Sequence, residues 1–480
     1  MSAEALEVVR GGLAGQRAWL VGGAVRDRLL GRPLSDLDVV LDGDPAEGAR
    51  AIARAAKRAG EGAACFPLSE EFGAWRVVAR GGAWQVDVER LRGGSLEVDL
   101  ALRDFTVNAI AEPLAGGEPL DPLGGLADLR AGHLRCAGPS SFADDPLRVL
   151  RLVRVAVELG LEPASQTLAA ARAQAARLNE VSPERVFFEL RRIVACPQAA
   201  RGIELMSEIG ATAVVLPELE AMRGVEQSRF HHRDVYGHTL EVFEYVVALT
   251  TPDGRETTEL GEALGEKYRA PVLALLGEPL ADGATRGEAL RWGALLHDAA
   301  KPETRSVRTL DRRVTFIGHD TRGADLAREV LWRLRASVRL REHVAGLVRH
   351  HLRLGFLVHE PQPLARETVF AYLRACEPVE VDVTLLSVCD RLATRGAKAE
   401  QAIERHLALA RRMLDDALRW RQQGPPKPLL RGDDLARELG IAPGPRVGEL
   451  LEALSQAQYT GAVSTPEQAL AFVRARGSSG

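Results

Sequence analysis

One short segment near the start of the chain restricts its fold more than any other. The residues from Leu20 to Gly43 read LVGGAVRDRLLGRPLSDLDVVLDG, a Gly-Gly turn followed by a short amphipathic helix and a strand that carries Asp36 and Asp38. Because alternate side chains of a strand share a face, the two carboxylates point the same way, while Leu37 and Val39 point into a core. We therefore expect a small βαβ-sized unit with two convergent acids.

This arrangement predicts a site that holds a nucleoside triphosphate through metal ions. Two convergent carboxylates suit Mg²⁺, and a pair of such ions can clamp an attacking hydroxyl and a departing pyrophosphate. Gly22 and Gly23 would bring backbone N–H groups to the phosphates at the start of the following helix. Asp-x-Asp and Gly-Gly are each common by chance, but together at this spacing they indicate a functional site.

The whole chain sets wider limits. Its 480 residues are too many for one core and indicate three or four domains. The net charge of -4 gives no global basic field, so a nucleic-acid surface must be local. The five cysteines form no CxxC pair, which argues against a disulfide scaffold and a zinc ribbon. No apolar run approaches membrane-spanning length, and we expect a cytoplasmic protein with no membrane partner.

A third carboxylate is expected on a later strand. Two strand-like runs, Trp75 to Arg80 and Ala83 to Leu91, follow the first unit. On the second run Asp87 and Glu89 share one face, opposite the apolar residues. We expect Asp87 to join the first two carboxylates in catalysis, with a solvated strand face as the alternative. For Glu89 we expect the solvated face.

Five sequence blocks occur in a fixed order along the first part of the chain. They are Leu20 to Gly43, RDFTVNAIA (Arg103 to Ala111), DPLGGLADLRAGHLR (Asp121 to Arg135), FADDPLRVLRLVRVAVELG (Phe142 to Gly160) and SPERVFFELRRIV (Ser182 to Val194). This series resembles the class II tRNA nucleotidyltransferases, the bacterial group that also includes poly(A) polymerases. The resemblance implies an α/β (α+β) N-terminal polymerase-beta-like palm, followed by mostly α-helical neck, HD and tail domains.

The resemblance also implies a role for the residues in these blocks. The catalytic carboxylates Asp36, Asp38 and Asp87 would act with Mg²⁺ held by the first two. Arg103 and Asp104 would read the ribose hydroxyls, and Arg26 would contact the triphosphate. The full set of expected nucleotide-binding residues is Gly22, Gly23, Arg26, Arg103, Asp104, Asn108, Asp145, Arg148, Arg151 and Arg154.

Nucleobase choice would come from side chains alone. Asp145 and Arg148 are three residues apart, so on a helix they face the same side. Such a pair can match the Watson–Crick edge of cytosine and, after rotation, that of adenine. The alternative is a helix-dipole contact with an ordinary ion pair. Arg151 and Arg154 continue the positive face, as phosphate contacts or as solvated residues, and Arg185 would brace this helix.

A short connection favours one subgroup of the family. Family members that build the whole CCA end carry a long flexible loop before the RDFTxNA block, but here only GGSLEV separates Arg92 from Asp99. The chain thus resembles the CC-adding enzymes, which use CTP on tRNA lacking its 3′ CCA and leave the last A to a separate enzyme. The alternatives are complete CCA addition from CTP and ATP, a poly(A) polymerase, and an HD phosphohydrolase with an RNA-binding head.

A second metal site is expected in the middle of the chain, where the histidines concentrate. The series His238, His297-Asp298, His319, His350 and Asp390 resembles the HD phosphohydrolases, which hydrolyse phosphoesters with a metal-activated water. The expected ligands of a divalent metal of unspecified identity are His238, His297, Asp298 and Asp390, with His319 and His350 as candidates for a second metal or a phosphate contact. Lys301 would contact a substrate phosphate. The residues expected to be surface or core histidines are His231, His232, His343, His351 and His359.

The expected domains follow from these blocks. They are a palm at 1–135, a helical neck at 136–225, an HD domain at 226–397 and a helical tRNA-binding tail at 398–480. Thr251 to Thr285 is polar and contains glycine, which predicts an insertion or loop.

Overall fold

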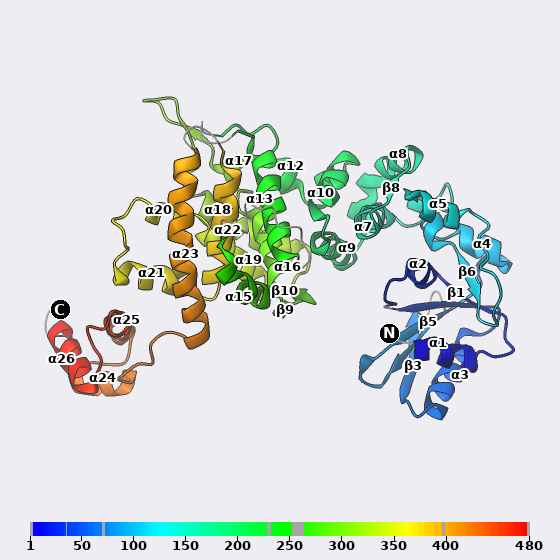
Figure 1. The fold of residues 1–480 in the computed structure, drawn as a ribbon, viewed down its shortest axis with the longest axis horizontal. Helices are drawn as coiled ribbons and strands as arrows, with labels where there is room; N and C mark the ends of the chain where they lie inside the picture. The colour runs from blue at the N-terminus through cyan, green and yellow to red at the C-terminus, as the bar shows by residue number, and fades with distance from the viewer. Residues whose placement is uncertain are drawn as a thin grey trace. The chain divides into compact units, whose positions relative to one another are not determined.

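The computed structural model of the chain describes residues 3–34, 36–69, 73–227, 232–251, 264–395 and 399–477. The chain divides into two compact units (Figure 1). The first comprises residues 1–189 and 204–215, and the second comprises residues 190–203 and 216–480.

The first unit contains a six-stranded mixed sheet with the strand order β3-β4-β5-β2-β1-β6. β2 and β5 pair in parallel, and the other neighbours are antiparallel. The strands are β1 (Ala18–Val21), β2 (Leu37–Leu41), β3 (Ala63–Ser69), β4 (Ala74–Ala79), β5 (Gln85–Arg90) and β6 (Ala111–Pro113). The predicted α/β head is confirmed.

The two faces of this sheet are packed differently. α1 (Ala3–Gly12) and α3 (Pro45–Arg58) cover one face, where Leu37, Val39 and Ile52 belong to a single apolar cluster. On the other face Val40 packs with Leu100 of α4 (Leu96–Ala101) in a smaller cluster. Alternation along β2 places Asp38 on this second face.

Helices and short elements complete the first unit. They are α2 (Gly23–Leu29), η1 (Arg80–Gly82), η2 (Arg92–Gly94), η3 (Thr106–Asn108), α5 (Gly125–Ala131), β7 (His133–Leu134), α6 (Ser141–Asp144), α7 (Arg148–Leu159), β8 (Glu162–Pro163), α8 (Ser165–Gln174), η4 (Ala175–Glu180), α9 (Pro183–Ala195), α10 (Ala199–Glu208) and α11 (Thr212–Val215). α9 and α10 cross the border between the two units.

The prediction that Asp145 and Arg148 share one helix face is wrong. α7 begins at Arg148, and Asp145 lies before it in an extended conformation with φ -144° and ψ 102°. The reason is Pro146, because a residue that precedes proline is sterically disfavoured in the helical region. The two side chains still lie close together in sequence, but they leave the backbone from different local structures.

The second unit is mainly helical. Its elements before the tail are α12 (Pro217–Glu220), α13 (Val235–Thr250), α15 (Glu266–Leu276), β9 (Pro279–Ala281), β10 (Ala284–Thr285), α16 (Arg286–Leu296), α17 (Lys301–Thr304), β11 (Ser306–Val307), β12 (Val314–Thr315), α18 (His319–Arg333), α19 (Val338–His350), α20 (Arg353–Leu357), α21 (Arg366–Cys376), α22 (Glu380–Ala393) and α23 (Ala399–Gln423). The predicted sequence of a sheet-containing head and mainly helical domains is therefore confirmed.

The predicted loop from Thr251 to Thr285 is wrong where the structure describes it. Residues 266–276 form α15, and residues 279–285 form the two strands β9 and β10. Tyr268, Val272 and Leu276 of α15 are buried at helical spacing, which anchors this segment to the domain. Residues 252–263 lie outside the described part of the chain.

The tail has a small core of its own. α24 (Gly432–Leu439), α25 (Pro445–Thr460) and α26 (Pro466–Gly477) enclose an apolar cluster that includes Leu435, Leu450 and Val473. The expected border between residues 397 and 398 falls between α22 and α23, which pack against each other. Within the described ranges, no helix is both long and apolar enough to cross a membrane.

Candidate functional site

The head brings the three predicted carboxylates together on one face of its sheet. The parallel pairing of β2 with β5 places Asp38 directly opposite Asp87. Asp36 stands just before β2 and accepts a hydrogen bond from the Nε2 of Gln85 at the start of β5. Two neighbouring strands therefore supply all three acids.

The electrostatics of these acids favour a cation. Burial raises the pKa of Asp38 to about 6; Arg103 opposes this shift, while the carboxylates of Glu89, Asp87 and Asp36 add to it. The charge of Glu89 thus acts on the site, although we expected it to be solvated. A partly buried cluster of like charges is stabilised by a bound divalent cation, and carboxylate oxygens are the ligands that Mg²⁺ prefers.

An arginine that we did not predict holds the third carboxylate. Arg76 of β4 donates from Nε to Oδ1 of Asp87 and from Nη2 to Oδ2, both at 2.7 Å. Such a two-pronged ion pair fixes the orientation of the carboxylate as well as neutralising it. The two-residue Gly81-Gly82 connection could have revealed this pair, because its register places residue 76 opposite residue 87.

The Gly-Gly turn packs directly onto the carboxylates. Gly22 has a φ of +71°, and a Cβ there would lie 2.9 Å from Oδ2 of Asp38 and 3.3 Å from Nη1 of Arg103. Only glycine fits this approach. The turn backbone, one carboxylate and one guanidinium therefore meet at a single point, next to the start of α2.

The short connection before the RDFTVNAIA block is an ordered turn. Arg92–Gly94 forms a 3-10 turn, and Ser95 then caps α4 by accepting a hydrogen bond from the backbone N–H of Val98 at 3.3 Å. Asp99 is fully buried and accepts from Nε of Arg92 at 2.8 Å and from Nη2 of Arg103 at 3.1 Å. The segment thus pins Arg103 beside Asp38 and projects no loop.

A hydrogen-bonded chain connects the other predicted nucleotide-binding residues. Arg26 Nη1 donates to Oδ1 of Asn108 at 2.5 Å, and Nδ2 of Asn108 donates to Oδ1 of Asp104 at 3.0 Å. The Nη2 of Arg151 lies 2.7 Å from Oδ2 of Asp104. Burial raises the pKa of Asp104, but Arg151 and the hydrogen bonds from Asn108 and the Phe105 backbone lower it to about 2.

This burial corrects the role expected for Asp104. Its residue is 6% exposed and its Oδ2 is buried, so in this geometry it offers no exposed oxygen to a ribose hydroxyl. Asp104 and Asn108 instead hold Arg26 and Arg151 in position.

The base-reading candidates are fixed from two sides. Asp145 accepts from Nη2 of Arg185 on α9 at 2.9 Å. Arg148 donates from Nη2 to the carbonyl of Leu102 at 2.9 Å and from Nη1 to the carbonyl of Arg103 at 3.2 Å. The start of α7 is therefore tied to the segment that carries Arg103 to the carboxylates.

The prediction for Arg154 is wrong. It is buried, and it donates to Glu189 at 2.6 Å and to Glu158 at 2.7 Å, so it is neither solvated nor open to a phosphate. Glu189 lies on α9, 35 residues further along the chain, which is why helical spacing around Arg154 alone could not show this pair.

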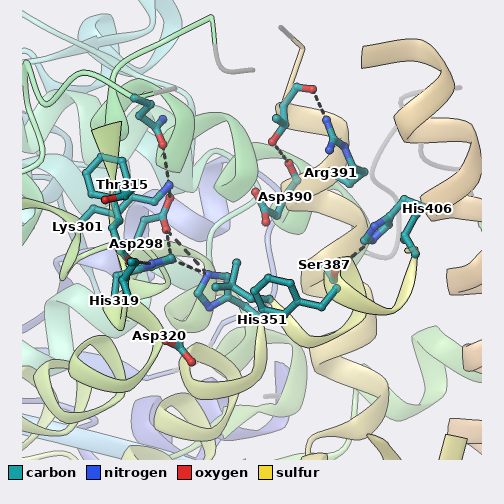
Figure 2. A pocket seen from close by; sticks show the side chains of 18 of the residues that line it. Asp298, Lys301, Thr315, His319, Asp320, His351, Ser387, Asp390, Arg391 and His406 are labelled. Carbon is teal, nitrogen blue, oxygen red and sulfur yellow. Dashed lines mark hydrogen bonds and ion pairs between the residues drawn. The ribbon is translucent and has the colours of Figure 1, made fainter. Parts of the chain in front are cut away.

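A second cluster lies in the second unit and combines histidines with aspartates. The ligand atoms of His238, His297 and Asp298 lie within 4.8 Å of one another, as do those of Asp298, His319 and His351. Asp298 belongs to both groups, and Figure 2 shows it with His319 and His351 of the second group. One carboxylate shared by two donor groups is the arrangement of a two-metal site.

The imidazole rings of three histidines in the cluster are oriented for metal binding. His297, His319 and His351 each place Nδ1 against a backbone carbonyl, of Ala294, Phe316 and Val348, at 2.8, 2.6 and 2.7 Å. This leaves each Nε2 directed at the cluster, which is how a neighbouring acceptor orients a metal-binding imidazole.

Two further residues complete the cluster. Asp390 Oδ1 lies 3.0 Å from Nε2 of His238. Lys301, expected at a substrate phosphate, lies with Nζ 2.6 Å from Oδ2 of Asp298 and donates to Gln227 at 2.6 Å. The predicted residues His238, His297, Asp298, His319 and Asp390 are thus brought together, and their nitrogen and oxygen donors fit a divalent metal.

The prediction that His350 is a metal ligand is wrong. The cluster contains its neighbour His351 instead. His350 accepts a hydrogen bond from Nε of Arg353 at 2.9 Å, whereas His351 is 1% exposed and its Nε2 lies 3.3 Å from that of His319. The sequence held a clue, because His351 continues the buried stripe of Leu340, Val344 and Leu347 at helical spacing. His350 points about 100° away from that stripe.

Three protein families match the chain. Residues 18–135 match the poly A polymerase head domain, residues 160–223 match the probable RNA and SrmB-binding site of polymerase A, and residues 235–395 match the HD domain. The chain is also 38% identical over 463 residues to an A-adding tRNA nucleotidyltransferase from Deinococcus radiodurans, with 95% of each chain covered. The chain belongs to the tRNA nucleotidyltransferase family.

Other relatives of this nucleotidyltransferase carry a different specificity. A CC-adding tRNA nucleotidyltransferase from Thermus thermophilus is 34% identical over 465 residues, covering 95% of this chain and 93% of the relative. The crystal structure of the Bacillus stearothermophilus CCA-adding enzyme in complex with CTP has 25% identity and a TM-score of 0.61, covering 99% and 98% of the two chains. The expected class II head, RNA-binding region and HD domain are confirmed.

Proposed function

We propose that this nucleotidyltransferase adds C residues, but not the final A, to the 3′ end of tRNA lacking CCA. The ordered turn from Arg92 to Asp99 supports this proposal. In family members that build the whole CCA end, a flexible loop at this place is thought to re-orient the template for the change from CTP to ATP. Here the segment is a capped helix start held by hydrogen bonds to Asp99, which favours a template that stays set for one nucleotide.

In the proposed reaction the 3′-hydroxyl of tRNA attacks the α-phosphate of CTP, and pyrophosphate leaves. Asp36 and Asp38 would hold Mg²⁺, which when bound supplies the positive charge that stabilises the attacking and leaving oxygens. The Gly22-Gly23 backbone and the guanidinium of Arg103 lie where they can hold the triphosphate. Asp87, oriented by Arg76, faces the same centre.

Selection of cytosine would follow from hydrogen-bond polarity. Cytosine presents an amino donor beside two acceptors, so the carboxylate of Asp145 can accept from the amino group while Arg148 donates to the acceptors. Uracil presents a carbonyl where cytosine has the amino group, so this acceptor would face the acceptor oxygens of Asp145. Arg185 would keep the Asp145 carboxylate in the required orientation.

Extension of two tRNA transcripts at single-nucleotide resolution tests this specificity. One transcript lacks CCA and the other ends in CC, and each is given CTP, ATP or both. We expect two C residues on the first transcript and incorporation of ATP on the second that is slower than that of CTP on the first by about 10²-fold or more. ATP incorporation at a rate comparable to that of CTP would contradict CC-only addition.

A-addition is the second candidate, because the A-adding relative from Deinococcus radiodurans is 38% identical over nearly the whole chain. It predicts the reverse result: ATP extends the transcript ending in CC, and CTP extends neither. Complete CCA addition predicts a full end from the mixed nucleotides on the first transcript.

We further propose that the HD cluster hydrolyses phosphoesters at RNA ends. Its support is the buried pair of donor groups that share Asp298, next to a cavity of about 740 Å³. His238, His297, Asp298 and Asp390 would hold a divalent metal, which would supply activation of the attacking water. In the hydrolysis the water oxygen would bond to phosphorus while the ester P–O bond breaks, and the leaving oxygen would take a proton. Hydrolysis of 2′,3′-cyclic CMP by the metal-loaded protein tests this activity.

Arg76→Gln should destabilise the metal-free head and increase its affinity for metal. The change leaves the partly buried Asp87 without its cation, at a cost of about 1–2 kcal/mol, or about 2–8 °C in melting temperature. Added Mg²⁺ should restore part of the loss, because it replaces the missing charge. Thermal melting with EDTA and with Mg²⁺ measures both effects. The exposed Arg80→Gln is the control, and equal melting of the two variants would contradict the role of Arg76.

A further inference from the structure

The cavity beside the HD cluster has a wall that the metal ligands do not use. Ser387 and Arg391 of α22 line it at the spacing of one helix face, and Thr394, just after the end of α22, lines it too. Arg405 and His406 of α23 also line it, and Figure 2 shows His406 beside Ser387. The other four come from α22 and α23, two helices that pack against each other.

The two arginines of this wall have no acidic partner. Within the described ranges, neither Arg391 nor Arg405 forms an ion pair; Arg391 donates from Nη2 to the Thr394 carbonyl at 2.8 Å, and Arg405 from Nε to the Gln401 carbonyl at 3.2 Å. The Nε of Arg391 is buried without a hydrogen-bond partner. Other arginines of this domain, such as Arg322 and Arg349, are bonded to carboxylates.

The rest of the wall is polar and uncharged. His406 is buried, and its Nε2 lies 3.1 Å from the Oγ of Ser387. Burial lowers the pKa of His406 to about 4, so the ring is neutral at neutral pH and can accept or donate a hydrogen bond. An anion at this wall would therefore meet two guanidinium groups that form no ion pair within the described residues, and three neutral hydrogen-bonding side chains.

Part of the cavity lining is apolar. Phe316, Ile317 and Phe356 line it, and Ile317 and Phe356 are 86% and 67% exposed. Large exposed apolar side chains at a cavity are typical of a binding surface. The cavity volume lies within the range of pockets that enclose a small-molecule ligand.

We propose that the HD cavity binds an RNA 3′ end through two successive phosphates: the terminal phosphoester at the His/Asp cluster and the preceding phosphodiester at Arg391 and Arg405. A nucleobase or sugar would lie against Phe356. This inference rests on the proposed phosphohydrolase function and names the substrate class of that site. A mononucleotide fills only the metal half of the cavity, whereas a dinucleotide end also uses the arginine wall.

Hydrolysis of two probes by the metal-loaded protein tests the proposal. The probes are 2′,3′-cyclic CMP, with one phosphate, and the dinucleotide CpC ending in a 2′,3′-cyclic phosphate, with two. We expect the dinucleotide to be preferred in kcat/KM by about tenfold or more, which corresponds to one charge-assisted phosphate contact. Arg405→Gln should remove that preference and change the mononucleotide by less than twofold.

Matched controls make the result decisive. Arg412→Gln changes an exposed arginine of the same helix that does not line the cavity, and it should leave both probes unaffected. Equal losses on both probes in Arg405→Gln, or no preference in the unaltered protein, would overturn the proposal.

A binding measurement separates this inference from the hydrolysis on which it rests. If the protein hydrolyses neither probe, calorimetry of cytidine 3′,5′-bisphosphate and of 3′-CMP still tests the wall. About tenfold weaker binding of the bisphosphate to Arg405→Gln than to Arg412→Gln supports it, with 3′-CMP unchanged. Identical binding of the bisphosphate to both variants contradicts it. The head site is the same in both variants, so any binding of the probe at that site contributes equally to the two titrations.

Discussion

Asp38→Asn is expected to abolish nucleotide addition, with a loss in rate of about 10³-fold or more, and to leave hydrolysis of 2′,3′-cyclic CMP unchanged. Asp38 contacts the Gly22 turn and faces Asp87 across the parallel pair of strands, so its carboxylate lies at the centre of the head site. The amide keeps the shape of the side chain but loses the charge that holds a divalent cation. Single-turnover extension of a tRNA transcript with CTP measures the loss.

The matched control for this change lies next to the same strand. Asp42→Asn alters an exposed carboxylate just after β2 that pairs with Arg17 at the surface, and it should keep the rate within about twofold. A slow Asp42→Asn variant would indicate damage to the strand and not to the chemistry. Loss of hydrolysis in Asp38→Asn with the fold intact would contradict the separation of the two sites.

His351→Ala is expected to remove metal from the HD cluster and to lower phosphoester hydrolysis by about 10²-fold or more, whereas His350→Ala should change neither by more than about twofold. His351 directs Nε2 at His319 and Asp298, while His350 lies outside the cluster and bonds to Arg353. Elemental analysis of the dialysed protein measures the metal content. The hydrolysis assay measures the activity.

Because His351 is fully buried, a second variant guards against misfolding. His351→Gln keeps more of the side-chain volume and should show the same loss of metal. Both variants should still extend tRNA with CTP, since the head carries its own carboxylates. Metal loss in His350→Ala instead of His351→Ala would show that the assignment from burial is wrong.

The sequence was sufficient where the evidence lay within one element. Alternation along β2 placed Asp36 and Asp38 on one side, and the same alternation on β5 placed Asp87 and Glu89 on one face; the sheet register sets Asp87 opposite Asp38. The pattern of His297-Asp298 after an apolar helix likewise located the second cluster. Periodicity is a property of a single strand or helix, and it needs no knowledge of partners.

The sequence was insufficient where the evidence lay in another element. Arg154 is paired with Glu189 of α9, and Asp104 is covered by Arg151 of α7, so neither is open as expected. The spacing of the arginines along α7 predicted one positive helix face, but it could not show that Glu189 of another helix pairs with Arg154. The difference between His350 and His351 was accessible, because the buried stripe of α19 distinguishes them, but adjacency in the sequence concealed it.

Anomalous diffraction from crystals soaked with Mn²⁺ and a non-hydrolysable CTP analogue tests the central claim most directly, because it locates the metals and the base in one measurement. We predict one set of peaks at Asp36 and Asp38, another at the cluster around Asp298, and the cytosine edge against Asp145 and Arg148. Mn²⁺ bound away from Asp36 and Asp38, or a cytosine held without Asp145 and Arg148, would contradict the account.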